Sequence, residues 1–225
     1  MSDISTLEKP NTKIIERIMQ QSSSPEVMTS IYEENCNIAI WKRQLPEAFV
    51  SSIESSFTTQ PPLTYSIVVN ATSVEKDIEQ IVLDREYGAQ LREYIKQTVD
   101  MFCCLFEGSR VGLRLSTLNK AMCPRFHVDR VPCRLITTFC GKGTEWLAHK
   151  NVNRSKLGHG NGGKPDDKSG LFNNSGDINT LACGDVALLK GETWEGNEGA
   201  GLVHRSPPLK SNESRLLMTL DFIGD

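Results

Sequence analysis

Two histidines and one aspartate form the pattern in this sequence that is best suited to chemistry. His127 and Asp129 are separated by one residue, and His204 follows 75 residues after Asp129. On an extended strand such a pair shares one face with Cα atoms roughly 6.6 Å apart, and a metal ion at about 2.1 Å from each ligand can bridge it. The pair alone is weak evidence, because the chain has four histidines. It gains weight if the fold brings His204 beside it.

Two imidazoles and one carboxylate on the same side of a metal leave its other coordination positions open. That arrangement suits iron(II) that has to bind both a co-substrate and dioxygen. Eleven residues after His204, Arg215 begins the run Arg-Leu-Leu-Met-Thr-Leu. Its planar guanidinium can bind a carboxylate through two parallel hydrogen bonds. Arg134 lies five residues beyond Asp129 and could face the same cavity, where it would bind co-substrate or substrate or form a structural ion pair.

Each of these residues also has a structural explanation. His127 can be a buried histidine that bonds Asp129 or the backbone without a metal. Asp129 can instead pair with a neighbouring arginine, and a surface ion pair stabilises a protein by only about 0–1 kcal/mol. Arg215 can pair with Glu213 or Asp221. The functional interpretation therefore depends on the whole set in this order.

The seven cysteines leave a zinc alternative open. None of them forms a Cys-x-x-Cys pair, so the spacing of a zinc ribbon or finger is absent from the sequence. Most are expected to be buried free thiols in a reducing compartment. Cys123 and Cys133 nevertheless flank the His-x-Asp motif, and thiolate ligands favour zinc. The remaining histidines, His149 and His159, lie in or beside a glycine-rich loop and are expected to be solvated.

The elements that must position these residues differ between the two halves of the chain. Gly88 is the only one of the 17 glycines before residue 107. In this first half, apolar residues recur at helical spacing and predict helices, with one strand at 65–69. The helical segments are 12–21, 25–35, 45–57 and most of 73–106.

From residue 109 the apolar period changes to two. Val111, Leu113 and Leu115 alternate with smaller or polar residues, which predicts a half-buried strand. Further strands are predicted at 124–129, 132–140, 144–148, 178–181, 185–190, 201–206 and 214–222. Many short strands separated by glycine or asparagine are typical of a sandwich or jelly roll. The segment 150–170 is rich in Gly, Asn and Lys, and a loop of that length is a lid, a binding loop or disordered.

Composition limits the classes of partner. The chain carries 25 Lys+Arg against 28 Asp+Glu, a formal charge of −3 and a pI near 5.9, which argues against a general nucleic-acid binder. No apolar run approaches the roughly 18 residues of a membrane span, so no membrane partner is expected. The polar N-terminus has no signal-peptide pattern. We therefore expect a cytoplasmic protein whose substrate is a small molecule or a protein.

The order of these motifs resembles a known superfamily. His-x-Asp, a distal His and a basic residue on the final strand are similar to the pattern of the iron(II)/2-oxoglutarate-dependent dioxygenases. A closer resemblance, over about 109–225, is to a bacterial family described only as a domain of unknown function. It is carried by Cys-Pro-x-Phe-His-x-Asp, by Arg-Leu-Ile-Thr-Thr from Arg134, and by Gly-x-Gly-Thr-Glu-Trp-Leu from Gly141. Members of that family are often encoded near zinc-homeostasis genes.

The resemblance to the dioxygenases implies a double-stranded β-helix and a set of roles. His127, Asp129 and His204 map to the metal ligands, and Arg215 maps to the residue that binds the distal carboxylate of 2-oxoglutarate. Arg134 is expected as a second cofactor-binding residue. The implied cofactors are iron(II) and 2-oxoglutarate, and the implied reaction is hydroxylation or demethylation of an unknown substrate.

These inferences predict an α+β protein in which helices pack on a jelly roll. Residues 1–106 form the mostly helical N-terminal region, and 107–225 form the jelly-roll domain with a long loop at 149–176. The alternative is a non-catalytic zinc-binding protein of the same fold that serves metal homeostasis. A dioxygenase needs Arg215 and an open coordination position, whereas a zinc store needs a fourth protein ligand, most plausibly a cysteine.

Overall fold

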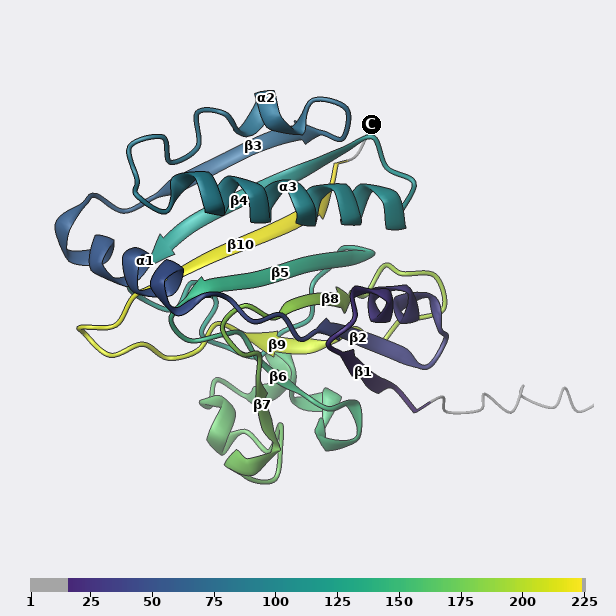
Figure 1. Ribbon diagram of the computed structural model, residues 1–225. Helices are drawn as coiled ribbons and strands as arrows, with labels where there is room; N and C mark the ends of the chain where they lie inside the picture. The colour runs from purple at the N-terminus through teal and green to yellow at the C-terminus, as the bar shows by residue number, and fades with distance from the viewer. Residues whose placement is uncertain (1–15, 224–225) are drawn as a thin grey trace, which may run out of the picture.

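The computed structural model describes residues 16–223, which form two β-sheets and a few helices (Figure 1). The larger sheet has the strand order β1-β2-β8-β5-β10-β4-β3, and the smaller has the order β7-β6-β9. All paired strands are antiparallel except β1 and β2. The strands are β1 (Ile18–Ser22), β2 (Cys36–Trp41), β3 (Thr64–Asn70), β4 (Arg110–Leu118), β5 (Cys133–Cys140), β6 (Glu145–Leu147), β7 (Ile178–Thr180), β8 (Val186–Lys190), β9 (Val203–Arg205) and β10 (Arg215–Phe222).

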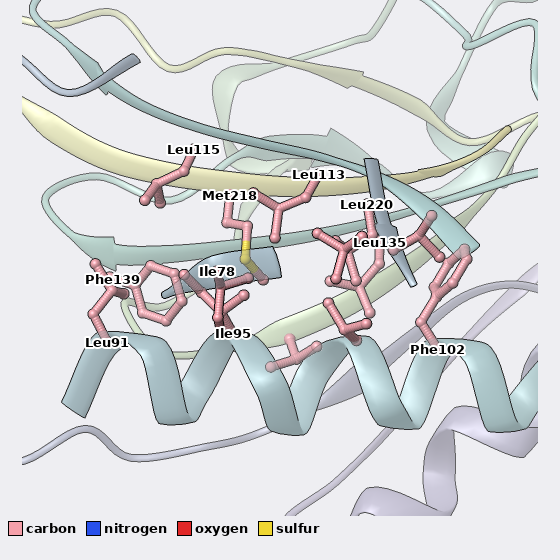
Figure 2. Packing of buried hydrophobic residues seen from close by; sticks show 14 of the residues in the cluster. Ile78, Leu91, Ile95, Phe102, Leu113, Leu115, Leu135, Phe139, Met218 and Leu220 are labelled. Carbon is pink, nitrogen blue, oxygen red and sulfur yellow. The ribbon is translucent and has the colours of Figure 1, made fainter. Parts of the chain in front are cut away.

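Helices cover one face of the larger sheet. They are η1 (Pro25–Tyr32, a 3-10 helix), α1 (Glu47–Thr59), α2 (Val74–Ile78) and α3 (Gly88–Leu105). In α3, Leu91, Ile95 and Phe102 fall on one stripe of the helix, as amphipathic spacing requires. Figure 2 shows this stripe packed on sheet residues such as Leu113 and Met218, which are fully buried. The main core therefore lies between the helices and the larger sheet.

The other face of the larger sheet packs against the smaller sheet. Side chains alternate between the two faces of a strand, and along β10 Leu216, Met218 and Leu220 belong to the helix-side core. Leu217 instead joins a second cluster that also contains Ile136 of β5 and Trp146 of β6. Odd-numbered residues of β10 therefore face the space between the two sheets.

The elements confirm part of the sequence prediction and correct part of it. The helix expected at 45–57 is α1, and the region 73–106 contains α2 and α3. The helix expected at 12–21 is wrong where the structure describes it, because Ile18–Ser22 form strand β1 beside β2; residues 12–15 lie outside the described residues. Strand β2 was not predicted, although its continuous apolar run is typical of an interior strand.

The strand expected at 124–129 is also wrong. This segment has irregular backbone, and its one regular pairing is an isolated bridge between His127 and His204. The strands expected around 132–140, 144–148, 178–181, 185–190, 201–206 and 214–222 are present as β5 to β10. The expected division at residue 106 stays a prediction, and the larger sheet takes strands from both sides of it.

The long loop at 149–176 is folded as short 3-10 turns rather than as extended chain. These turns are η2 (His149–Asn151), η3 (Arg154–Lys156), η4 (Gly158–Asn161), η5 (Asp166–Lys168) and η6 (Ser175–Asp177). Leu171 from this loop is buried against Phe126. The loop is thus packed on the segment that carries His127. Within residues 16–223, no helix is both long and apolar enough to cross a bilayer.

Gly141, directly after the end of β5, lies against the backbone at the start of β10, and this close contact gives a prediction about stability. Its φ is +86°, and an added Cβ would lie 2.9 Å from the Cα of Arg215 and closer still to the carbonyl of Ser214. We expect Gly141→Ala to lower the free energy of unfolding by about 3 kcal/mol, from left-handed backbone strain and overpacking together. Denaturant unfolding measures this loss.

Gly162 provides the matched control for Gly141. Its φ is +61°, and no atom lies within 4 Å of the position an added Cβ would take. Gly162→Ala should therefore carry the backbone strain alone, about 1–2 kcal/mol. Equal losses for the two variants would contradict the role of the close approach at Gly141.

Candidate metal centre

His127 and His204 are brought together by the pairing of their own backbones. The amide of His127 donates to the carbonyl of His204, and the amide of His204 donates to the carbonyl of His127, both at 3.0 Å. The two ring centroids lie 4.6 Å apart. His204 is held in place by β9, which pairs with β6. Two residues that are distant in sequence are therefore neighbours across a single bridge.

Hydrogen bonds orient both rings toward Asp129. The Nδ1 atom of His127 lies 2.9 Å from the carbonyl of Arg125, and that of His204 lies 3.2 Å from the carbonyl of Leu202. Because a carbonyl only accepts, Nδ1 carries a proton in both rings, and in the neutral form of each ring Nε2 has the lone pair that a metal ion would use. The Nε2 atoms lie 3.6 and 3.5 Å from the carboxylate of Asp129.

The three side chains form a cluster that fits a metal ion. One ligand atom from each of His127, Asp129 and His204 lies within 4.8 Å of the others, and in the part of the chain that the structure describes this is the one such group of three or more. Nδ1–H bonds to backbone carbonyls are the usual outer support of metal-binding histidines. The three side chains named from the sequence thus lie together in the structure, and their role as metal ligands stays a prediction.

The three members of the cluster have pKa values shifted in different directions. Burial acts to raise the pKa of Asp129, but the hydrogen bond from His127 and the charges of His204 and Arg134 lower it to about 2. Burial lowers the pKa of His204 to about 4, while the hydrogen bond to Asp129 raises the pKa of His127. Near neutral pH Asp129 is therefore ionised and His204 is neutral, as metal binding requires, whereas a metal ion would have to displace any proton on Nε2 of His127.

Arg134 links Asp129 to the larger sheet. Its Nη1 donates to Asp129 at 2.7 Å, while Nε and Nη2 donate to Asp221 at 2.6 and 3.1 Å. Arg134 and Asp221 are paired across β5 and β10. The guanidinium is therefore occupied by two carboxylates and positions Asp129. Its expected contact with a cofactor stays a prediction.

This geometry predicts that Arg134 supports metal binding. Arg134→Gln removes the bridge that orients the Asp129 carboxylate, and losing such an outer partner weakens metal binding by about 10–100-fold. An anaerobic titration with iron(II) measures this change in Kd. Lys76→Gln, which removes an exposed cation of α2, is the control, and its Kd should equal that of the wild type. An Arg134→Gln protein with wild-type affinity would contradict the positioning role.

Arg215 is a buried cation with free donors. It is 1% exposed, and its Nη2 donates to the hydroxyls of Thr138 and Thr144 at 3.3 and 3.2 Å. Its Nε and Nη1 are buried and have no hydrogen-bond partner among the described residues. Burial lowers its pKa to about 10, so it stays charged near neutral pH. The ion pairs with Glu213 or Asp221 considered from the sequence are not formed in residues 16–223.

The cysteines do not join the cluster. Cys133 is fully buried in the helix-side core, and burial raises the pKa of its thiol far above the ordinary value. Cys123 is exposed, and its backbone pairs with Ser206. Among the described residues, the cluster therefore consists of His127, Asp129 and His204, with no cysteine beside them.

Asp166 is a supporting residue that the sequence did not reveal. It is 7% exposed, and its carboxylate accepts from the backbone amide of Phe126 at 2.9 Å and from Arg125 Nε at 3.0 Å. It thereby ties the 149–176 loop to the residues that precede His127. An acidic residue in a Gly- and Lys-rich segment is an ordinary surface pattern, so only the fold identifies this contact.

Comparison with known proteins places the chain among others of similar form. A family model described as "Protein of unknown function (DUF1826)" matches residues 22–221. No curated protein matches the chain. Among solved structures, the dioxygenase for auxin oxidation of rice has a TM-score of 0.53 and 11% identity, over 92% of this chain and 82% of its own.

Two further solved structures are similar at lower scores. A prolyl-4-hydroxylase of Pseudomonas putida has a TM-score of 0.43 and 12% identity, over 88% of this chain and 96% of its own. HygX of Streptomyces hygroscopicus, with nickel and 2-oxoglutarate bound, has a TM-score of 0.46 and 11% identity, over 88% of this chain and 86% of its own. At these identities the likeness to the rice protein concerns the fold alone.

Proposed function

The chain belongs to the DUF1826 family of proteins of unknown function, and we propose that it is a non-haem iron(II)- and 2-oxoglutarate-dependent dioxygenase. The observation that carries this proposal is the cluster of His127, Asp129 and His204, with both Nε2 atoms directed at one carboxylate. A buried guanidinium with free donors supports it. The similarity of fold to the rice dioxygenase agrees with the same superfamily.

The two sheets fit a double-stranded β-helix. In this reading the larger sheet, with β8, β5, β10 and β4 at its centre, is the major sheet, and β7-β6-β9 is the minor sheet. Their shared cluster of Ile136, Trp146 and Leu217 fills the space between them. His204 comes from the smaller sheet, whereas Arg215 comes from the larger one. The centre would thus lie between the sheets, as a ligand site in such a fold does.

Each residue has a distinct task in the proposed mechanism. Iron(II) would be held on one side by His127, Asp129 and His204, and with 2-oxoglutarate and dioxygen it supplies the oxidising chemistry. Arg215 would bind the distal carboxylate of 2-oxoglutarate through its free Nε–H and Nη1–H. Arg134 holds Asp129 in position. The 149–176 loop, fastened by Asp166, packs on Phe126 and so holds the segment that carries His127.

The product would be a hydroxylated or demethylated substrate together with succinate and carbon dioxide. The substrate is a small molecule or a protein, and the proposal involves neither nucleic acid nor a membrane. The cytoplasmic location and the link to zinc homeostasis remain expectations from the sequence. The zinc alternative would use the same three ligands, and it needs a fourth that the described cluster lacks.

An anaerobic titration of the metal-free protein tests the proposal. Iron(II) is added first and 2-oxoglutarate second, and the visible charge-transfer band of their chelate is followed. We expect the band to appear at one equivalent of each. The band should not form with zinc, which has a filled d shell. Iron binding without the band, or tight binding of zinc alone, would overturn the proposal.

A further inference from the structure

Two guanidinium groups bind the segment that leads from β8 to β9. Arg17, just before β1, is 8% exposed, and it donates from Nε to the side chain of Asn197 at 2.9 Å and from Nη2 to the carbonyl of Gly196 at 2.7 Å. Arg154, in η3, donates from Nη2 to the carbonyl of Gly201 at 2.7 Å. Both cations are therefore anchored on the chain that leads from β8 to β9.

Neither cation has a carboxylate partner in residues 16–223. The acceptors of their hydrogen bonds are neutral carbonyl and amide oxygens, together with a ring nitrogen of His149 at 3.3 Å from Arg154. Nη1 of Arg17 and Nε of Arg154 are buried and unpartnered. The acidic residue whose charge acts on Arg154 is Glu192, and its two oxygens accept backbone amides instead.

The surroundings contain one further cation and one neutral imidazole. Burial lowers the pKa of His149, and the charges of Arg154 and Arg17 lower it further while Glu16 raises it, so the ring is neutral near pH 7 and can donate from one of its nitrogens. Burial also lowers the pKa of Lys190, which is 2% exposed, and the charge of Arg17 acts in the same direction. Burying a cation whose N–H groups have no partner is unfavourable, and an anion that accepts the free N–H groups of Arg17 and Arg154 would relieve this cost.

We propose that Arg17, His149 and Arg154 form a binding site for an oxyanion, a carboxylate or phosphate group. It is separate from Arg215, which lies on β10 and bonds Thr138 and Thr144. Guanidinium groups with free donors are the preferred partners of both kinds of oxyanion.

The proposed oxyanion site lies at one end of the β6–β9 ladder that carries His204 of the metal centre. Trp146 of β6 is paired with His204 of β9, and Leu147 with Val203. His149 and Gly201 follow at the same end of this ladder, three residues from Trp146 and His204, which is roughly 10 Å along a strand. Resting on the proposed function, we infer that the oxyanion is part of the primary substrate. Acidic metabolites, phosphate esters or acidic peptide side chains are the substrates to screen.

Thermal unfolding of the metal-free protein in inorganic phosphate or acetate tests the site, with ionic strength held constant by chloride. One of the two anions should raise the Tm by about 3–6 °C at ten times its Kd. Arg154→Met and Arg17→Gln should abolish that rise. Arg154→Met should also melt no lower than the wild type in chloride alone, because it removes an uncompensated charge. An arginine with a purely structural role would instead lower the Tm.

Two further variants locate the anion. Lys150→Met, which removes an exposed cation of the same loop, should keep the full rise in Tm. Arg215→Met removes the other buried cation that can bind a carboxylate, and it should keep the part of the rise that depends on Arg17 and Arg154. Retention in Arg154→Met with loss in Arg215→Met would move the anion to Arg215 and overturn the proposal, as would a wild-type Tm that neither anion changes. The Tm measurement uses no iron. A failure of the anion proposal, seen as an unchanged Tm, is therefore distinguishable from a failure of the dioxygenase proposal, seen as a missing chelate band. Anion binding without that band would leave the site standing and reject the dioxygenase.

Discussion

Replacing His204 by alanine is expected to abolish both iron(II) binding and turnover of 2-oxoglutarate. His204 is one of three ligand groups, and it is 5% exposed with its Nε2 held 3.5 Å from Asp129. Loss of an outer partner weakens metal affinity by about 10–100-fold, so loss of a ligand itself should exceed about 100-fold. Equilibrium dialysis with iron(II) under anaerobic conditions measures the Kd, and succinate formation measures turnover.

The interpretation of this variant depends on a folded protein. Far-UV circular dichroism and the Tm establish the fold, and His204→Gln provides a second variant that fills more of the same space. His159→Ala removes an exposed histidine of the long loop and should leave the Kd unchanged. Iron bound by the folded His204→Ala protein with wild-type affinity would show that the ligand assignment is wrong.

Replacing Arg215 by methionine is expected to weaken the binding of 2-oxoglutarate without changing the binding of iron(II). Iron(II) binding should be unchanged, because Arg215 bonds Thr138 and Thr144 and not the ligand residues. The Kd of 2-oxoglutarate should rise roughly 100-fold, since loss of a buried charge partner costs about 3 kcal/mol. Titration of the chelate band at fixed iron(II) measures this Kd.

The stability of the Arg215→Met protein gives an independent check, because the variant should be more stable than the wild type without ligands and less stable with them. Without 2-oxoglutarate, the Arg215 guanidinium is buried and two of its nitrogens are unpartnered, so methionine should raise the free energy of unfolding by about 1–3 kcal/mol. With saturating iron(II) and 2-oxoglutarate, the wild type should be the more stable protein. An unchanged requirement for 2-oxoglutarate in the folded variant would refute the role of Arg215.

The predicted effects at Arg134 and Arg215 differ for a structural reason. Arg134 is neutralised by Asp129 and Asp221, so its removal leaves Asp129 without its arginine partner and leaves Asp221 with only the more distant Arg114, at 3.9 Å. Arg215 has no carboxylate partner among the described residues, so its removal deletes an unpaired charge. The first variant is therefore expected to weaken metal binding, and the second to weaken binding of an acidic co-substrate while stabilising the empty protein.

Much of the candidate centre was visible in the sequence because it depends on residue type and order. His127, Asp129, His204 and Arg215 were identified by their chemistry and their placement along the chain, and the structure brings the first three together. Most strands of the second half were predicted as well, since a period of two is a local property of a half-buried strand. Helix α1 was predicted for the same reason at a period of 3.6.

Other features depended on contacts between distant segments. Strand β1 reads locally as an amphipathic helix, but pairing with β2 satisfies its backbone in the larger sheet. The local sequence around His127 predicts a strand. Its backbone is instead irregular, because it bonds His204 through a single bridge and Asp166 through the amide of Phe126. In both places tertiary hydrogen bonding overrode local propensity.

The sequence by itself determined which groups are available for chemistry and which segments can be buried. Only the tertiary structure decided that Arg134 bonds Asp129 and Asp221 while Arg215 keeps free donors, and that Arg17 and Arg154 both bond neutral oxygens of residues 196–201. All four are arginines in unremarkable local sequence. Their roles differ because a charged group's partners are set by what folds against it over a few ångströms, and those neighbours come from elsewhere in the chain.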